Sequence, residues 1–236
     1  MYSIDTKIRY SEIDKNRKLK PLALLNLLQD CCTFQSEDVG NTGISMRDMN
    51  RAWILNSWQV IVFKDVKLGD LVTVSTMPYE FKGFFGMRCF EIKDKKTGER
   101  IAIANSVWTY LNTKTGTPAR IEKEIQEMYG IDELIDFDWA GRKIPIPENL
   151  EKLEAFDVRG SFIDTNNHVN NAWYVELAAE NLPEDFSYNA MRVEYKKSAV
   201  LGDRLMPMIC RGTDKNVVVM ADEDENPYAT VEFYSV

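Results

Sequence analysis

The only histidine of the chain, His168, lies in a polar segment whose residue types could perform acid–base chemistry. Asp164, Asn166 and His168 alternate within the segment 164–171, directly before a predicted helix. In an extended loop, a two-residue spacing sends three side chains to the same side. A neutral imidazole can take a proton from water or return one to a leaving group near pH 7, provided that a carboxylate or amide fixes its tautomer. The segment therefore predicts acid–base chemistry centred on His168.

The predicted helix start adds a second chemical feature. Backbone N–H groups near residues 170–172, together with the positive end of the helix, suit a carbonyl oxygen that gains negative charge. A structural interpretation competes with the chemical one. In that interpretation Asn170 or Asn171 caps the helix, Asp164 holds a turn and His168 is an ordinary polar loop residue. The motif by itself leaves both interpretations open.

An internal repeat separates shared residues from those unique to one copy. Residues 11–19 align with residues 161–169 at a constant offset of 150, and Ser, Ile, Asp and Asn recur in place. A Leu-Gly-Asp triplet at 68–70 recurs at 201–203, in the same order along the chain. Two ordered matches indicate a duplication. Because Lys18 stands where the second copy has His168, the shared residues look structural and the histidine looks added.

Both halves also predict the same order of elements, a helix followed by about four strands. Apolar residues at helical spacing predict a helix that opens at 21–29, with Cys32 on its apolar stripe, and a longer connection from about residue 38 to residue 51 follows it. Period-two patterns bounded by turn residues predict strands at 53–63, 71–77, 87–93 and 101–111. The second half predicts a helix over 172–181 and strands at 191–197, 204–210, 217–221 and 228–234. An apolar helix needs cover on most sides, which a wrapped antiparallel sheet provides.

The fold class predicted from this order is α+β, a tandem or double hotdog in which each half wraps an antiparallel sheet around a central helix. The expected division is an N-terminal unit at 1–118, a linker at 119–150 that is acidic and then contains prolines, and a C-terminal unit at 151–236. A single continuous mixed sheet is the alternative, and no βαβ pattern favours it.

Composition limits the possible functions. The chain has 236 residues, 44% of them hydrophobic and 28% charged, which excludes a disordered, collagenous or membrane-spanning protein. A net charge of −8 argues against broad nucleic-acid binding. Four cysteines without C-x-x-C spacing and a single histidine make a zinc site unexpected, and no cofactor is indicated. With no signal or transit pattern at the start, a cytoplasmic protein is expected.

The chain resembles the acyl-acyl carrier protein thioesterases of plants and bacteria, which hydrolyse fatty acyl thioesters. The resemblance covers nearly the whole chain and rests on the residues at 10–14, 28–30, 96–108, 164–171 and 193–197. It implies that the first half binds the acyl chain and that the second half carries the chemistry. It also implies that Asp164, Asn166 and His168 occupy the catalytic positions.

One departure from the family pattern bears on the mechanism. After the strand that resembles Glu-Tyr-Lys-Lys, the plant-type enzymes have Glu and Cys, whereas this chain has Ser198 and Ala199. A cysteine nucleophile at that position is therefore excluded, and we expect His168 to activate or orient water, with Asn166 positioning the water or the carbonyl. Possible supporting residues are Asn170, Ser198 and Glu194.

The expected partner is an acyl carrier protein loaded with a fatty acyl chain. Because that carrier is acidic, docking needs a local cationic face. The candidates are Lys196 with Lys197, which flank the expected site, and Arg142 with Lys143. Neither nucleic-acid binding nor membrane insertion is expected, and the chain is expected to be a monomer or a homodimer.

Two other functions remain open at this stage. The same fold could serve a coenzyme A thioesterase or a dehydratase, the latter using a carboxylate such as Asp30 on the opposing helix. Alternatively, the missing Glu and Cys would fit a non-enzymatic acyl-binding sensor. Acyl chain length depends on the depth of the binding cavity, which packing sets and the sequence pattern does not.

Overall fold

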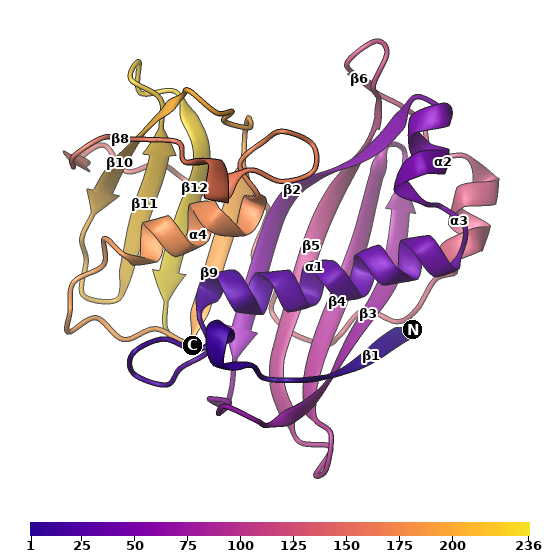
Figure 1. Ribbon diagram of the computed structural model, residues 1–236, viewed down its shortest axis with the longest axis horizontal. Helices are drawn as coiled ribbons and strands as arrows, with labels where there is room; N and C mark the ends of the chain where they lie inside the picture. Colours follow the sequence, from indigo (N-terminus) through magenta and orange to yellow (C-terminus); the bar gives the residue numbers. More distant parts are fainter.

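A continuous antiparallel sheet forms one layer of the protein, and two helices, α1 (Pro21–Asp38) and α4 (Asn171–Ala179), lie across the same face of it (Figure 1). The computed structural model describes residues 1–236. In spatial order the first half of the sheet contains β1 (Tyr2–Lys7), β3 (Leu71–Lys82), β4 (Phe85–Asp94), β5 (Arg100–Asn112) and β2 (Arg51–Val62). The second half contains β9 (Ala190–Tyr195), β12 (Pro227–Tyr234), β11 (Lys215–Ala221), β10 (Arg204–Cys210) and β7 (Glu151–Lys152).

Shorter elements complete the two halves. The strand β6 (Thr117–Pro118) pairs with β5, and β8 (Phe156–Asp157) pairs with β10. The remaining helices are η1 (Tyr10–Glu12), α2 (Gly43–Asp48), α3 (Lys123–Tyr129) and η2 (Gly160–Phe162).

The strand order is mirrored about the seam between β2 and β9, where the halves join by antiparallel pairing from Ser57 opposite Glu194 to Ile61 opposite Ala190. On each side of the seam the order of the main strands along the chain is the same. This is the predicted α+β double hotdog. The competing idea of a single continuous sheet is correct only in that the sheet is unbroken, because its pairings are antiparallel and not mixed.

The sequence repeat corresponds to repeated backbone geometry. Gly69 and Gly202 both adopt a positive φ, of 90° and 99°, which favours glycine. Asp70 and Asp203, which follow them, each accept a backbone N–H three residues earlier, at 2.8 and 2.9 Å. The second Leu-Gly-Asp triplet therefore rebuilds the turn made by the first.

The structure adds local detail to the predicted elements. The helix that opens at 21–29 runs to Asp38, where the connection was expected to begin, with Cys31, Cys32 and Gln35 on its buried face. The connection expected from Asp38 to Arg51 contains α2, whose start is capped by the Thr42 side chain accepting from Ser45 N–H at 3.0 Å. The strand β1 was not among the predicted elements, and its alternating exposure is that of an edge strand.

One hydrophobic core of 38 buried residues extends under both helices and across the seam. The segment 130–150 crosses the opposite face of the sheet. There Ile135, Phe137 and Trp139 cover Ile61, Ile103 and Ala190. The two faces of the sheet therefore have different environments, with helices on one and this strap on the other. No helix combines the length and apolar character needed to span a membrane.

Candidate functional site

The loop that carries His168 is a tight turn organised by Asp164. One carboxylate oxygen of Asp164, Oδ1, accepts the backbone N–H of Asn166 at 2.8 Å and of His168 at 3.2 Å. The backbone N–H of Asp164 donates to the carbonyl oxygen of His168 at 2.8 Å, and Asn167 adopts a φ of 62°. The loop is therefore not extended, and the expectation that all three side chains point to one side is wrong for Asp164, which turns into its own loop.

The first half contains the same turn without the histidine. Asp14 accepts the backbone N–H of Asn16 and Lys18, each at 2.8 Å, and its own N–H donates to the carbonyl of Lys18 at 2.8 Å. Arg17 has a φ of 63°, matching Asn167. Because the aspartate makes these bonds in both copies, its local role is to hold the turn. The residues that differ, Lys18 and His168, are the ones free to differ in function.

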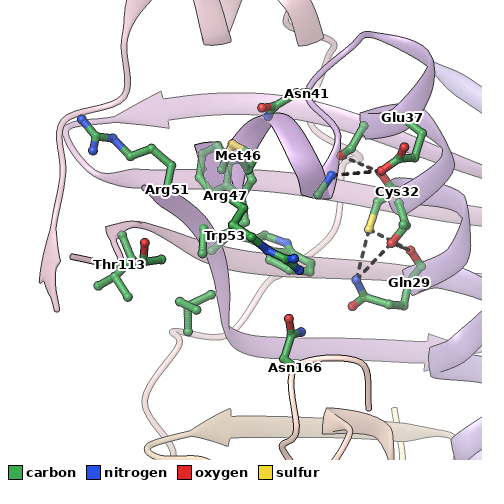
Figure 2. Close-up of a pocket in the computed structure, with 18 of the residues that line it drawn as sticks. Gln29, Cys32, Glu37, Asn41, Met46, Arg47, Arg51, Trp53, Thr113 and Asn166 are labelled. Atoms are coloured by element: carbon green, nitrogen blue, oxygen red, sulfur yellow. Dashed lines mark hydrogen bonds between the residues drawn. The ribbon is translucent and has the colours of Figure 1, made fainter. Parts of the chain in front are cut away.

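A cavity of about 840 Å³ lies between α1, α2 and the first half of the sheet, and the His168 loop forms part of its wall. Residues 165–168 of the second half line it together with Gln29 and Cys32 of α1, Met46 and Arg47 of α2, and Trp53 of β2. Figure 2 shows Asn166 approaching from the second-half loop, with Trp53 lying between it and α2. The fold thus brings a polar loop of one half to a cavity built by the other.

Asn170 fixes the start of α4. Its side-chain oxygen accepts the N–H of Ala172 at 2.9 Å, its carbonyl accepts the N–H of Trp173 at 2.9 Å, and its own N–H donates to Phe162 at 2.8 Å. The expectation that N–H groups near residues 170–172 would hold a developing negative charge is therefore wrong for Asn170 and Ala172. Both donors are already used, as the capping interpretation expected.

Ser198 lies on the segment that runs beside the His168 loop. The N–H of Val169 donates to the carbonyl of Ala199 at 2.9 Å, and the N–H of Ala199 donates to the Tyr174 hydroxyl at 2.8 Å. Burial raises the pKa of that hydroxyl well above its usual value, so it stays protonated. These bonds attach the Ser198 segment to the loop, while the Ser198 side chain itself is exposed.

Glu194 lies on the other face of the sheet. Its neighbours Val193 and Tyr195 face the core under the helices, so alternation along β9 turns Glu194 toward the strap. There its carboxylate accepts from Lys196 at 2.6 Å and from the N–H of Ile144 at 3.1 Å, with Arg142 at 3.6 Å. The structure therefore separates Glu194 from the cavity and joins it to two of the predicted docking residues.

The remaining candidates are dispersed. Lys143 contributes its carbonyl to Arg192 at 3.0 Å, within the strap. Lys197 pairs with Asp222 and lies 4.4 Å from the centre of the Tyr228 ring. Asp30, the carboxylate on which a dehydratase would depend, is exposed and does not line the cavity. Asp30 therefore gives the dehydratase alternative no support.

A polar cluster at the cavity wall was missed by the sequence analysis. Nη1 of Arg88 donates to Oε1 of Gln35 at 2.9 Å and to the Thr76 hydroxyl at 3.1 Å, and its guanidinium lies 5.3 Å from the centre of the Tyr129 ring. The Tyr129 hydroxyl in turn bonds to Ser36 and Asn41, each at 2.8 Å. The sequence could have indicated Arg88, because side chains alternate along a strand and residues 88, 90 and 92 therefore share one face. Phe90 and Ile92 on that face are buried.

Comparison with known families gives two matches that together cover most of the chain. Residues 1–129 match the family described as the acyl-ACP thioesterase N-terminal domain, and residues 147–228 match the acyl-ACP thioesterase C-terminal domain. Both matches agree with the resemblance inferred from the motifs.

Individual relatives point the same way. A chloroplastic dodecanoyl-[acyl-carrier-protein] hydrolase of Cinnamomum camphora is 25% identical over 218 residues, which is 85% of this chain and 57% of that protein. The chain therefore spans little more than half the length of this relative. An acyl-ACP thioesterase structure from Bacteroides thetaiotaomicron superposes with a TM-score of 0.89 at 22% identity, covering 98% of this chain and 96% of the other. A 12:0-ACP thioesterase structure from Umbellularia californica superposes with a TM-score of 0.86 at 20% identity, covering 99% and 96%.

Proposed function

Because this chain belongs to the acyl-ACP thioesterase family, we propose that it hydrolyses the thioester between a fatty acyl chain and an acyl carrier protein. The observation that carries the proposal is the position of the His168 loop. This loop lies in the wall of a cavity of about 840 Å³ that the other half of the chain builds. The corresponding loop of the first half has a lysine and does not line this cavity. An acyl chain in the cavity would therefore present its thioester to the loop that has the imidazole.

In the proposed mechanism, His168 acts on water. The imidazole takes a proton from a water molecule whose oxygen attacks the thioester carbonyl carbon, giving a tetrahedral oxyanion. Asn166 also lines the cavity, and its side-chain amide donates a hydrogen bond to the oxyanion. When the carbon–sulfur bond breaks, the imidazolium returns its proton to the departing thiolate. The products are the free fatty acid and the carrier thiol, so that protons and electrons balance without a cofactor.

Asp164 is a positioning residue in this proposal. Its Oδ1 accepts the backbone N–H groups of both Asn166 and His168, so it sets the spacing of the two reacting side chains. Ser198 and Ala199 stand where the plant-type pattern has Glu and Cys, so the proposal needs no covalent intermediate. The exposed Ser198 hydroxyl, on the segment bonded to the loop, is available to hold the attacking water.

The proposed partner is an acidic acyl carrier protein. Among the docking candidates, Lys196 and Arg142 are both bound to Glu194, yet their side chains keep 41% and 33% of their exposure. They could therefore still contribute positive field at the seam. A cytoplasmic location fits the four free cysteines, which a reducing compartment keeps as thiols.

The test is single-turnover release of free fatty acid from acyl carrier protein thioesters. His168→Ala should lower the rate by about 100-fold or more, the usual contribution of a positioned acid–base group. Lys18→Ala, at the equivalent position of the first half, is the matched control and should leave the rate unchanged. Full activity in His168→Ala would overturn the mechanism, and absence of turnover on every thioester by the wild type would overturn the proposed function. Ser198→Glu should keep or raise the rate.

A further inference from the structure

Gln29 is a polar residue of the cavity wall that the proposed mechanism does not use. It is half-buried on α1 and lines the cavity together with Asn166 and His168. Its Nε2 lies 3.5 Å from the Thr33 hydroxyl and 3.8 Å from the Cys32 sulfur, and hydrogen bonds of this length are weak. Figure 2 shows the Gln29 amide on the side of the cavity that faces Asn166. A substrate can therefore engage this carboxamide without breaking a strong bond.

The packing of the two helices places position 29 beside the His168 loop. The helices α1 and α4 contact each other and run in opposite directions (Figure 1). The N–H of Leu22 donates to Oε2 of Glu176 at 2.9 Å, so residue 22 of α1 is about level with residue 176 of α4. Seven residues further along α1, position 29 is then about level with residue 169, at the end of the His168 loop. Position 29 is also the first along α1 to line the cavity, so it is the part of the helix nearest to this loop.

The internal repeat distinguishes Gln29 in the same way as it distinguishes His168. At the offset of 150 that aligns the two loops, Gln29 corresponds to Ala179 of α4. The cavity combines the loop that has the histidine with the helix that has the glutamine, one from each half. The mirrored combination, the first-half loop and α4, has Lys18 and Ala179. Because duplicated halves share the residues that their common fold needs, the residues unique to this cavity are the candidates for chemistry.

We propose that Gln29 is a catalytic residue, whose side-chain amide donates a second hydrogen bond to the oxyanion of the tetrahedral intermediate. The inference rests on the proposed function, in which Asn166 is the first donor. The N–H groups of Asn170 and Ala172 are already bonded, so the second donor has to come from elsewhere. A neutral amide on α1 approaches the carbonyl from the side opposite the loop and stabilises charge that develops only in the transition state. Gln29 transfers no proton, so the proton balance between His168 and the thiol is unchanged.

Steady-state hydrolysis of a dodecanoyl carrier thioester tests the role in the wild type, Gln29→Met, Gln29→Glu and Asn26→Ala. Gln29→Met keeps a side chain of similar length but removes the donor, so kcat should fall about 100- to 1,000-fold while KM stays within about threefold. Gln29→Glu should lose at least as much, because a carboxylate repels the oxyanion. Asn26→Ala is the matched control, because it removes a carboxamide from the same helix at a residue that does not line the cavity. Its kcat should stay within about twofold of the wild type.

Two kinetic results would overturn the inference while leaving the proposed function intact. The first is an unchanged kcat in Gln29→Met, or a loss confined to KM, because a transition-state donor acts on kcat. The second is activity of Gln29→Glu at or above the wild-type level. A residue that holds the attacking water as an acceptor survives that replacement, whereas a donor to the oxyanion does not.

Binding of a tetrahedral mimic tests the same role without turnover. A long-chain trifluoromethyl ketone hydrates to a tetrahedral carbon with two oxygens, whereas the methyl ketone of equal length stays planar. Calorimetry on the wild type should show tighter binding of the trifluoromethyl ketone, and Gln29→Met should lower this preference by about tenfold or more. Equal loss of affinity for both ketones would overturn the inference, because it would indicate general packing. A preference that depends on Gln29, without turnover of any thioester by the wild type, would support the inference and contradict the proposed function.

Discussion

The duplicated aspartate turn provides an internal control for the role of Asp164. Asp164 and Asp14 each accept two backbone N–H groups through Oδ1, in loops of the same geometry, but only the second loop reaches the cavity. Replacing either aspartate with alanine leaves two N–H groups for water to satisfy. By analogy with aspartate caps of helices, each replacement should lower the free energy of unfolding by about 1–2 kcal/mol. At this chain length that corresponds to a fall of roughly 2–8 °C in Tm.

The two replacements should differ in activity. Asp164→Ala releases the loop that spaces Asn166 and His168, and a misplacement of about 1 Å can cost on the order of 100-fold in rate. Asp14→Ala should leave kcat within about twofold, because its loop has no reacting group. The measurements are thermal unfolding and single-turnover hydrolysis of the same preparations. Equal activity losses in both variants would refute a specific role for Asp164, because they would trace the loss to general instability.

Asp164→Asn distinguishes positioning from proton transfer. The amide keeps an oxygen that can accept both N–H groups, so stability should stay within about 0.5 kcal/mol of the wild type and kcat within about tenfold. If the carboxylate itself moved a proton, the same variant would lose about 100- to 10,000-fold. A loss of that size with unchanged Tm would refute the assignment of Asp164 as a positioning residue.

Three further predictions concern packing and charge. Burial raises the pKa of Glu176 above 4.5, so the folded state binds its proton more tightly and stability falls as pH rises through the raised pKa. The Leu22 N–H donates to the Glu176 carboxylate at 2.9 Å, and Glu176→Gln keeps an oxygen that can accept this bond. The variant should therefore be more stable at pH 7, and its free energy of unfolding in urea should change less between pH 4 and 8. In Gly86→Ala the new Cβ would lie 2.9 Å from the Trp53 ring, so overpacking should lower the free energy of unfolding by about 1–3 kcal/mol. Because Trp53 lines the cavity, activity on longer acyl chains should fall more than activity on shorter ones. Glu194→Ala should lower the free energy of unfolding by about 2 kcal/mol and make the strap at 130–150 more sensitive to limited proteolysis. A large fall in kcat would contradict the placement of Glu194 away from the cavity.

Much of the fold followed from local pattern. The helix and strand periods, the turn residues and the ordered repeat predicted two similar halves, because each depends on neighbours a few positions apart. Errors arose where tertiary contacts intervened. The edge strand β1 was missed because only its pairing with β3 reveals it.

The catalytic motif shows the same boundary between local and distant information. The sequence singled out Asp164, Asn166 and His168, and comparison with residues 11–19 already identified the aspartate as a shared element and the histidine as the added one. It placed Glu194 near the site because the residue is close to Ser198 along the chain. In the structure, alternation along β9 turns Glu194 to the opposite face of the sheet, where the strap covers it.

The sequence by itself determined the two-fold plan, the aspartate turn and the single imidazole available for chemistry, since these follow from residue types at short spacing. The tertiary structure decided what the imidazole faces. The seam between β2 and β9 brings the second-half loop to a cavity walled by residues from Gln29 to Tyr129. It also decided that Arg88 and Asn41 share Tyr129 although they are far apart in sequence. Contacts of this kind depend on chain crossings and side-chain packing, which no local period records.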